Sequence, residues 1–492
     1  MKNMAKSEIR DMTTGSPFKL ILGFAVPMLL GLLFQQFYSM VDTIIVGKYL
    51  GVKALAAVGS TGSINFMIIG FCTGVCSGFA IPVAQRFGAG DYRGLRKFAA
   101  NAAWLSLFFS AAMAVTVCVL CRRILLWMQT PEDIIDQAHS YIFIIFAGIP
   151  VTYLYNMTAG IIRSLGDSRT PVYFLLLSSV INIVLDLFTI IVLKMGPAGA
   201  AWATVISQGV SGVLCLLYMK KHFEILRLQK DERKIDGQIM KILCKMGIPM
   251  GLQYSITAIG SVILQASVNT LGSMAVAAVA AGSKVSLFFC CPFDALGGTM
   301  ATYAGQNVGA KKLERIRQGV KSASVIGCIY SAAAFLVLLL FSGKIALLFM
   351  DAGETETISR VSLFLTANSA FYIPLVFVNV VRFAIQGMGY STFAILAGVF
   401  EMAARGLVGL FLVPVFGYIA ACFGSPLAWV FADIFLIPAF SHCLRRMKKN
   451  FEENEEIRKW FIRRNKYESG AYCIIREGSG RGQRVFYPFL WG

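Results

Sequence analysis

Residues 50–58 read LGVKALAAV and residues 271–279 read LGSMAVAAV, so the pattern Leu-Gly-x-x-Ala-x-Ala-Ala-Val occurs twice, 221 residues apart. The same offset aligns QRFGA at 85–89 with QNVGA at 306–310. Two motifs held at one offset are hard to explain by chance, and they predict that the chain consists of two homologous halves. The polar stretch 220–245 separates these halves.

The composition indicates a membrane protein. Of 492 residues, 57% are hydrophobic and only 14% are charged, whereas soluble domains hold about 25% charged residues. Helices satisfy their own backbone hydrogen bonds in lipid, and about 20 apolar residues suffice to cross a bilayer. Twelve apolar segments meet this requirement, at residues 18–42, 56–84, 98–120, 138–162, 171–193, 198–219, 246–272, 278–304, 319–341, 361–385, 392–414 and 418–442. We therefore predict an all-α integral membrane protein with twelve transmembrane helices, arranged as two six-helix lobes related by the internal repeat.

An even number of spans in each half gives both halves the same orientation in the membrane. Such repeats are related by an axis along the membrane normal, and they enclose a binding site near the midplane. This arrangement is typical of transporters.

The net charge of +19 is explained by topology rather than by a nucleic-acid partner, because Lys and Arg cluster in loops. The clusters follow the second, sixth and eighth spans, at Arg86–Lys97, Lys220–Lys245 and Lys311–Lys321. Cytoplasmic loops retain such cations, so we expect a multi-pass protein of the plasma (inner) membrane with both termini in the cytoplasm. The expected regions are a cytoplasmic N-terminus (1–16), a first lobe (17–220), a cytoplasmic inter-lobe loop (221–245), a second lobe (246–444) and a cytoplasmic tail (445–492).

The tail differs in kind from the rest of the chain. It holds an acidic patch at 452–456, then Ile457, Trp460 and Phe461 at helical spacing, and a Gly-rich stretch at 478–482. This pattern predicts a short interfacial helix followed by disorder.

Ionisable residues inside apolar spans are costly and point to function. Asp42 ends the first span and Asp186 lies within the fifth, each preceded one turn earlier by a polar side chain, Tyr38 and Asn182. Two carboxylates with an amide and a phenol suit a proton or a sodium ion. The alternative for Asp42 is a position at the outer interface, beside Lys48.

The second half also carries charges in its spans. Glu401 and Arg405 are four residues apart and could form an internal ion pair, with either a structural role or a role in substrate contact. Asp294 lies within a span, and Arg382 and Asp433 are expected near the membrane surfaces, where long side chains reach water easily.

The sequence argues against an enzyme. A phosphate loop requires Gly-Lys followed by Ser or Thr, but Gly343-Lys344 is followed by Ile345. His139, His222 and His442 are too scattered for a metal site or a hydrolytic triad. We therefore expect no cofactor and no metal site, apart from a sodium ion as an alternative to the proton, and an ion gradient as the source of energy.

These features, with further motifs, resemble the multidrug and toxic compound extrusion (MATE) family over about residues 15–445. The motifs are Pro27 with Gln36, Tyr38 and Asp42; Gly47-Lys48-x-Leu50-Gly51; Ala84-Gln85-x-x-Gly88-Ala89; Arg163-Ser164-x-Gly166-Asp167-x-x-Thr170-Pro171; Asn182-x-x-x-Asp186; Gly199-Ala200-Ala201-x-Ala203-Thr204; Pro249; Gln306-x-x-Gly309-Ala310; and Gln386-Gly387-x-Gly389. The resemblance implies a V-shaped pair of lobes that exports drugs or other amphipathic organic cations by cation-coupled antiport. We expect a monomer with such small molecules and the lipid bilayer as its partners.

The resemblance to the prokaryotic branch with an aspartate pair implies specific roles. A coupling site for proton or sodium would comprise Asp42, Asn182, Asp186 and Thr204, with Tyr38 beside it, and Pro27 would be the hinge of the first helix. Other branches use a glutamate in the first helix of the second half, where this chain holds Gln253 and Thr257. The substrate cavity would be lined or neighboured by Tyr38, Gln36, Gln253, Glu401 and Arg405.

Other functions fit less well. The loop GDYRGLRK at 90–97 loosely resembles a motif of the major facilitator superfamily, but the second-half loop keeps QNVGA instead. Flippases for lipid-linked sugars or polysaccharides are related to the MATE family, although they often have fourteen spans. A membrane-embedded transferase would need clustered His, Asp or Glu at a membrane surface, and the twofold repeat argues against a receptor or scaffold.

Overall fold

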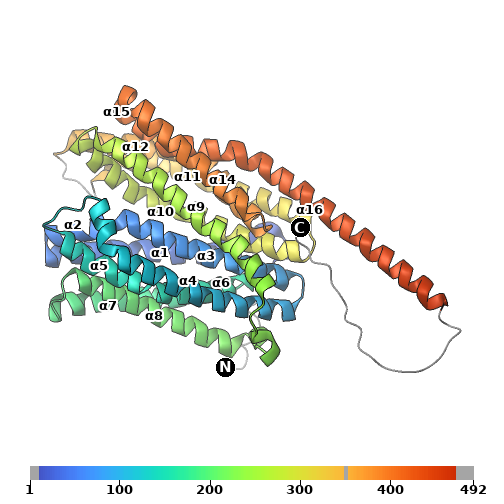
Figure 1. Ribbon diagram of the computed structural model, residues 1–492. Helices are drawn as coiled ribbons and strands as arrows, with labels where there is room; N and C mark the ends of the chain where they lie inside the picture. The colour runs from blue at the N-terminus through green and yellow to red at the C-terminus, as the bar shows by residue number, and fades with distance from the viewer. Residues whose placement is uncertain (1–9, 348–352, 472–492) are drawn as a thin grey trace. The chain divides into compact units, whose positions relative to one another are not determined.

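The computed structural model describes residues 10–347 and 353–471 and shows a helical chain (Figure 1). The α-helices are α1 (Pro17–Leu50), α2 (Val52–Ser60), α3 (Gly62–Gly88), α4 (Tyr92–Trp127), α5 (Ile135–Ala147), α6 (Ile149–Ser164), α7 (Arg169–Leu187), α8 (Pro197–His222), α9 (Gly237–Asn269), α10 (Ser273–Gly309), α11 (Leu313–Ala346), α12 (Thr355–Ala370), α13 (Tyr372–Gly387), α14 (Ser391–Leu407), α15 (Val413–Cys422) and α16 (Gly424–Ala471). Short 3₁₀ segments, Glu224–Leu226 and Lys230–Arg233, lie between α8 and α9, and π-helical segments follow α7 (η1, Phe188–Val192) and α14 (η4, Val408–Leu412). The predicted all-α class is confirmed.

The membrane spans agree with the sequence prediction. Among residues 10–347 and 353–471, ten continuous helical stretches are long and apolar enough to cross a bilayer. Two helix pairs, α5 with α6 and α12 with α13, also qualify but bend by 44° and 50°. These pairs correspond to the predicted spans 138–162 and 361–385, and counting each as one span brings the total to twelve.

The internal repeat is visible in the breaks of the helices. Gly51 separates α1 from α2 with a φ of 83°, and Gly272 separates α9 from α10 with a φ of 93°. Glycine adopts this left-handed conformation without steric cost, which explains why both motifs begin with Leu-Gly. The π-helical segments η1 and η4 start 220 residues apart, at Phe188 and Val408. The two halves therefore share local geometry as well as sequence.

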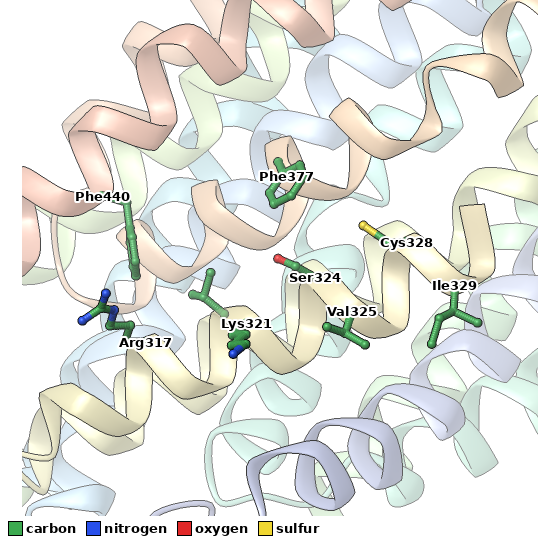
Figure 2. Close-up of a pocket in the computed structure, with 9 residues that line it drawn as sticks. Arg317, Lys321, Ser324, Val325, Cys328, Ile329, Phe377 and Phe440 are labelled. Atoms are coloured by element: carbon green, nitrogen blue, oxygen red, sulfur yellow. The ribbon is translucent and has the colours of Figure 1, made fainter. Parts of the chain in front are cut away.

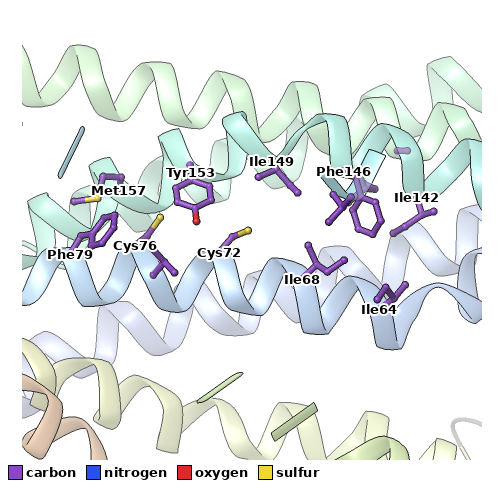
Figure 3. Packing of buried hydrophobic residues seen from close by; sticks show 14 of the residues in the cluster. Ile64, Ile68, Cys72, Cys76, Phe79, Ile142, Phe146, Ile149, Tyr153 and Met157 are labelled. Atoms are coloured by element: carbon purple, nitrogen blue, oxygen red, sulfur yellow. The ribbon is translucent and has the colours of Figure 1, made fainter. Parts of the chain in front are cut away.

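The core of the first half forms where α3 packs against α5 and α6 (Figure 3). Ile68 and Cys72 of α3 face Phe146 of α5 and Ile149 and Tyr153 of α6, all of them buried. Lipid is as apolar as these side chains, so close packing holds the helices together rather than exclusion from water. This explains why small cysteines and glycines recur on the buried face of α3.

The two halves meet along α3 and α9, which lie side by side in Figure 1. A Cβ atom at Gly74 would lie 2.6 Å from the carbonyl oxygen of Met250, and one at Gly78 would lie 2.5 Å from the Cα of Gly247. Only glycine allows two helix backbones to approach this closely. The junction therefore depends on a glycine face on each helix.

The repeated QxxGA motifs form the end of this junction. A Cβ atom at Gly88 would collide with the carbonyl oxygen of Gln306, and one at Gly309 would collide with that of Gln85. The side chain of Gln85 also donates to the carbonyl oxygen of Gly387, at 2.9 Å. The motif thus recurs because each copy packs against the other at the end of the molecule that carries the basic loops.

The inter-lobe loop is held on the first half. Arg96 at the start of α4 donates two 2.7 Å hydrogen bonds to the buried carboxylate of Glu232. Asn101 and Trp104 of the same helix donate to the carbonyl oxygens of Lys234 and Arg233, at 3.3 and 3.2 Å. The loop is therefore anchored to α4 rather than being a loose linker.

The tail differs from the sequence prediction. Residues 445–471 continue α16 instead of starting a separate short helix. Lys448 and Glu452, and likewise Lys449 and Glu453, stand four residues apart with nitrogen–oxygen distances of 3.8 and 3.7 Å, a spacing that supports a helix. The side chains of Ile457, Trp460 and Phe461 and the stretch 478–482 fall outside the described part of the chain. Residues 444–492 form a unit of their own.

Candidate functional site

The two predicted acids of the first half lie together. Asp42 of α1 and Asp186 of α7 lie close enough for their carboxyl groups to interact electrostatically. Asp186 is fully buried, and no described donor reaches either of its oxygens or Oδ1 of Asp42. Two carboxylates this close repel each other unless a proton or a cation stands between them. The position of Asp42 beside Asp186 does not fit the alternative, in which Asp42 stands alone at the outer interface.

Asn182 and Thr204 complete the cluster of oxygen atoms. Asn182 is buried one turn before Asp186, and its Nδ2 lies 3.4 Å from Oγ1 of Thr204 on α8. Its Oδ1 is buried without a hydrogen-bond partner. Helices α1, α7 and α8 thus bring together the four residues that the resemblance implied.

Aromatic and amide side chains surround the acids. Tyr38 lies one turn before Asp42 and close to the side chain of Gln208 of α8. Gln208 in turn accepts a 3.1 Å hydrogen bond from Thr152 of α6. The buried ring of Tyr141 from α5 lies close enough to both carboxyl groups to interact with them electrostatically.

Sequence reasoning missed Tyr141, Thr152 and Gln208. They come from three different helices and form no motif with the acids. A polar amide inside an apolar span is itself a signal of function, and applying this rule to Gln208 would have found it.

The backbone next to Asp186 is locally widened. The α-helix ends at Leu187 and continues as the π-helical segment η1. Oγ1 of Thr189 donates to the carbonyl oxygen of Leu185 at 2.8 Å and lies 3.4 Å from that of Asp186. Segments of π-helix are rare and often mark functional sites, and this one directly follows the buried acid.

Pro27 and Gln36 lie on the same helix as Asp42 but apart from the cluster. Pro27 interrupts the hydrogen bonds inside α1. It precedes Asp42 by 15 residues, or about 22 Å along the helix. Gln36 is half-buried and makes no hydrogen bond to the cluster within the described residues.

The predicted ion pair of the second half exists and includes a third member. Glu401 accepts from Arg405 at 3.4 Å and from Arg382 at 2.7 Å, and all three side chains are buried. Arg382 and Asp433, which the sequence predicted near the membrane surfaces, are each only 8% exposed and so lie inside the protein. Arg382 is neutralised inside the protein because α13 and α14 place Glu401 beside it.

Gln253 lies in the same half, on α9. Its Oε1 accepts a 2.7 Å hydrogen bond from Gln386, and both side chains are buried. A Cβ atom at Gly398 of α14 would lie 3.5 Å from Cγ of Gln253. Gln253, Glu401 and Arg405 are therefore packed at the seam between α9, α13 and α14, whereas Asp294 on α10 is exposed.

Comparisons with known proteins agree with this geometry. The MatE family profile matches residues 27–188 and 249–412, once in each half. The probable multidrug resistance protein YoeA of Bacillus subtilis (strain 168) is 30% identical over 350 residues, which cover 70% of this chain and 76% of YoeA. YpnP of the same organism, also a probable multidrug resistance protein, is 31% identical over 62% of this chain and 68% of its own length.

A solved structure shows the same fold. The outward-facing conformation of a multidrug resistance MATE family transporter superposes with a TM-score of 0.84. It covers 90% of this chain and 99% of its own, at 22% identity. The matched profile, the relatives and the repeated helical fold lead to one conclusion: this chain belongs to the MATE family of multi-pass membrane transporters and is not an enzyme.

Proposed function

We propose that this transporter exports drugs or other amphipathic organic cations across the plasma membrane in exchange for a proton or a sodium ion. The observation that carries the proposal is the proximity of Asp42 and Asp186, with buried oxygens that no described donor satisfies. The relatives named as multidrug resistance proteins support export of varied small molecules. The chain acts as a monomer in this proposal.

The cluster supplies the chemistry that a small cation requires. The carboxylates of Asp42 and Asp186, Oδ1 of Asn182 and Oγ1 of Thr204 are all hard oxygen donors, which suit sodium as well as a proton. An empty site would hold two facing carboxylates in a low-dielectric interior, at a cost that favours rapid reloading. Release of the ion on one side is therefore tied to a change of conformation or to arrival of a cationic substrate.

Helix α1 links the site to the opposite half. It carries Asp42, and it also carries Met28, whose Cε would lie 2.6 Å from a Cβ atom at Gly298 of α10. Oγ1 of Thr299 on α10 lies 3.9 Å from Sδ of Met28. Pro27 directly precedes Met28, so a bend of α1 at Pro27 would move this contact, and in this proposal Pro27 is the hinge through which ion binding reaches the second half.

Alternating access also requires the two halves to separate at the end of the α3–α9 junction where the QxxGA motifs pack against each other. That end carries the basic loops, so it faces the cytoplasm in this proposal, with both termini on the same side. Opening there separates the QxxGA motifs of the two halves, which now pack backbone to backbone.

Purified protein in proteoliposomes tests the function. We expect ethidium to be driven uphill by an imposed proton gradient or by an imposed sodium gradient, and the effective gradient identifies the ion. Equal ethidium movement with and without either gradient would contradict cation coupling. Absence of ethidium movement by folded protein under all conditions would contradict export of organic cations.

A further inference from the structure

A groove of about 540 Å³ opens on the second half between α11, α13 and α16 (Figure 2). One wall is a stripe of α11 that runs from Arg317 to Ile329 at helical spacing. Phe377 of α13 and Phe440 of α16 form the opposite wall. The groove belongs neither to the aspartate cluster nor to the buried charges around Glu401.

Two unpaired cations stand at one end of this groove. Arg317 and Lys321 lie one turn apart on α11, and both are exposed. Neither forms an ion pair with an acid in residues 10–347 or 353–443. They belong to the basic cluster Lys311–Lys321, which the sequence places at the cytoplasmic surface, and they lie near the N-terminus of α11. Cations at that surface are at the depth where lipid headgroups lie.

An unsatisfied hydroxyl lies one turn deeper. Ser324 is 9% exposed, and its Oγ is buried without a hydrogen-bond partner. On the same helix, Oγ of Ser331 donates to the carbonyl oxygen of Gly327 at 2.8 Å, which is the usual solution for serine in an apolar helix. Figure 2 shows the Ser324 hydroxyl on the side of α11 that faces Phe377. Its donor is therefore available to an acceptor in the groove.

The rest of the groove is apolar and has the length of a lipid chain. Val325, Cys328 and Ile329 continue the α11 stripe below Ser324. Arg317 and Ile329 are twelve residues apart, or about 18 Å along the helix. One leaflet of the hydrocarbon core is about 15 Å thick, half of the roughly 30 Å bilayer core. A water-soluble anion would pair with Arg317 and Lys321 but would not contact the apolar wall formed by Val325, Cys328 and Ile329. A lipid without a negative charge would contact this wall but would leave the two cations unpaired.

We propose that this groove binds an anionic phospholipid of the cytoplasmic leaflet. Arg317 and Lys321 hold the phosphate, Ser324 donates to a glycerol or ester oxygen, and one acyl chain lies along Cys328 and Ile329 against Phe377. Basic pockets between transmembrane helices on the cytoplasmic side are known to take such headgroups. The site is independent of the coupling ion and of the exported substrate.

Lipid retention tests the proposal. Full-length protein is reconstituted in nanodiscs of phosphatidylcholine and phosphatidylglycerol at 4:1, extracted in mild detergent and examined by native mass spectrometry. We expect wild type to retain phosphatidylglycerol in preference to phosphatidylcholine. The double variant R317Q/K321Q should retain about tenfold less phosphatidylglycerol than wild type, because two cations no longer attract the headgroup.

A matched control removes the same charge elsewhere. Lys241 and Lys245 are exposed, four residues apart near the start of α9, and do not line the groove, so K241Q/K245Q should retain phosphatidylglycerol as wild type does. Cys328→Phe fills the groove and keeps both cations, and it should also lose retention. Equal retention by wild type and R317Q/K321Q would overturn the proposal. Displacement of the lipid by soluble glycerol phosphate would also overturn it, since the site would then recognise the headgroup alone.

Discussion

Gln306 accepts a 2.9 Å hydrogen bond from the backbone amide of Met12, a residue that precedes it by 294 positions. The same Gln306 side chain donates to the carbonyl oxygen of Ser164 at 2.9 Å. One side chain of the second half therefore holds two segments of the first half. Met12 is 1% exposed, which shows that the segment before α1 is part of the junction and not a loose terminus.

The rest of this N-terminal segment, residues 10–15, is fastened in the same way. The backbone amide of Arg10 donates to the carbonyl oxygen of Leu165 in the first half. On the other side, Lys312 of the second half donates to the carbonyl oxygen of Thr13 at 2.9 Å, and Arg315 donates to that of Gly15 at 3.0 Å. Opening the molecule at this end breaks these bonds.

Gln306→Ala should loosen the N-terminal segment. It removes two buried hydrogen bonds, each worth about 1 kcal/mol, so amide hydrogen exchange of residues 10–15 should accelerate about tenfold or more. Gln265→Ala is the control, because within the described part of the chain the exposed side chain of Gln265 bonds only to Asn269, one turn further along α9. Unchanged exchange in Gln306→Ala would show that this segment does not hold the halves together.

Glycine at position 78 should be required for the junction. In Gly78→Ala the new Cβ meets the backbone of Gly247, and separating α3 from α9 costs about 1–3 kcal/mol by overpacking. We expect a lower melting temperature and impaired efflux. Gly59→Ala serves as the control, since a Cβ there would have no neighbour within 4 Å among the described residues. Equal melting temperatures for the two variants would contradict the close approach.

The charges around Glu401 should be structural. Glu401→Gln removes the carboxylate that pairs with both Arg382 and Arg405; breaking such a buried pair costs about 3–5 kcal/mol, so the variant should have a much lower melting temperature. The exposed pair of Glu356 and Arg360 provides the comparison: Glu356→Gln should cost less than about 1 kcal/mol. A thermally stable Glu401→Gln variant with altered substrate preference would instead place Glu401 in the substrate site.

The anchor of the inter-lobe loop should depend on pH. The two hydrogen bonds from Arg96 lower the pKa of Glu232 from 4.5 to about 2. Because the folded-state pKa is the lower one, the stabilisation is complete above pH 4.5 and is lost as the pH falls toward 2. The difference in melting temperature between wild type and Glu232→Gln should therefore be large at pH 6 and shrink below pH 4. A difference that stays constant over this range would contradict the ionised pairing.

Much of the fold could be predicted from the sequence because the bilayer imposes its own rules. The length of the apolar segments predicted the spans, and the motifs that contain Gly51 and Gly272 predicted the repeat. These two glycines recur because each adopts a backbone conformation with positive φ. The bends between α5 and α6 and between α12 and α13 were not predicted, because hydropathy does not distinguish a bent pair from a straight span. The continuation of α16 beyond residue 445 was missed because its polar residues resemble a separate segment.

The site was predicted only in part, for a related reason. Spacing along a helix placed Asn182 beside Asp186 and Tyr38 beside Asp42, but contacts between helices are tertiary. The sequence therefore did not predict that Tyr141 and Gln208 belong to the site. The pairing of Arg382 with Glu401 was not predicted, because the two residues lie on different helices, α13 and α14.

The central claim is that the pair of Asp42 and Asp186 exchanges a small cation for the exported molecule. The most direct measurement is uphill ethidium transport in proteoliposomes under an imposed ion gradient, for wild type, Asp186→Asn and Asp433→Asn. Asp433 is the matched control, a buried acid of the second half whose Oδ1 also has no hydrogen-bond partner. The account predicts that Asp186→Asn loses gradient-driven transport at unchanged melting temperature, whereas Asp433→Asn keeps it. Uphill transport by Asp186→Asn at the wild-type rate would contradict it.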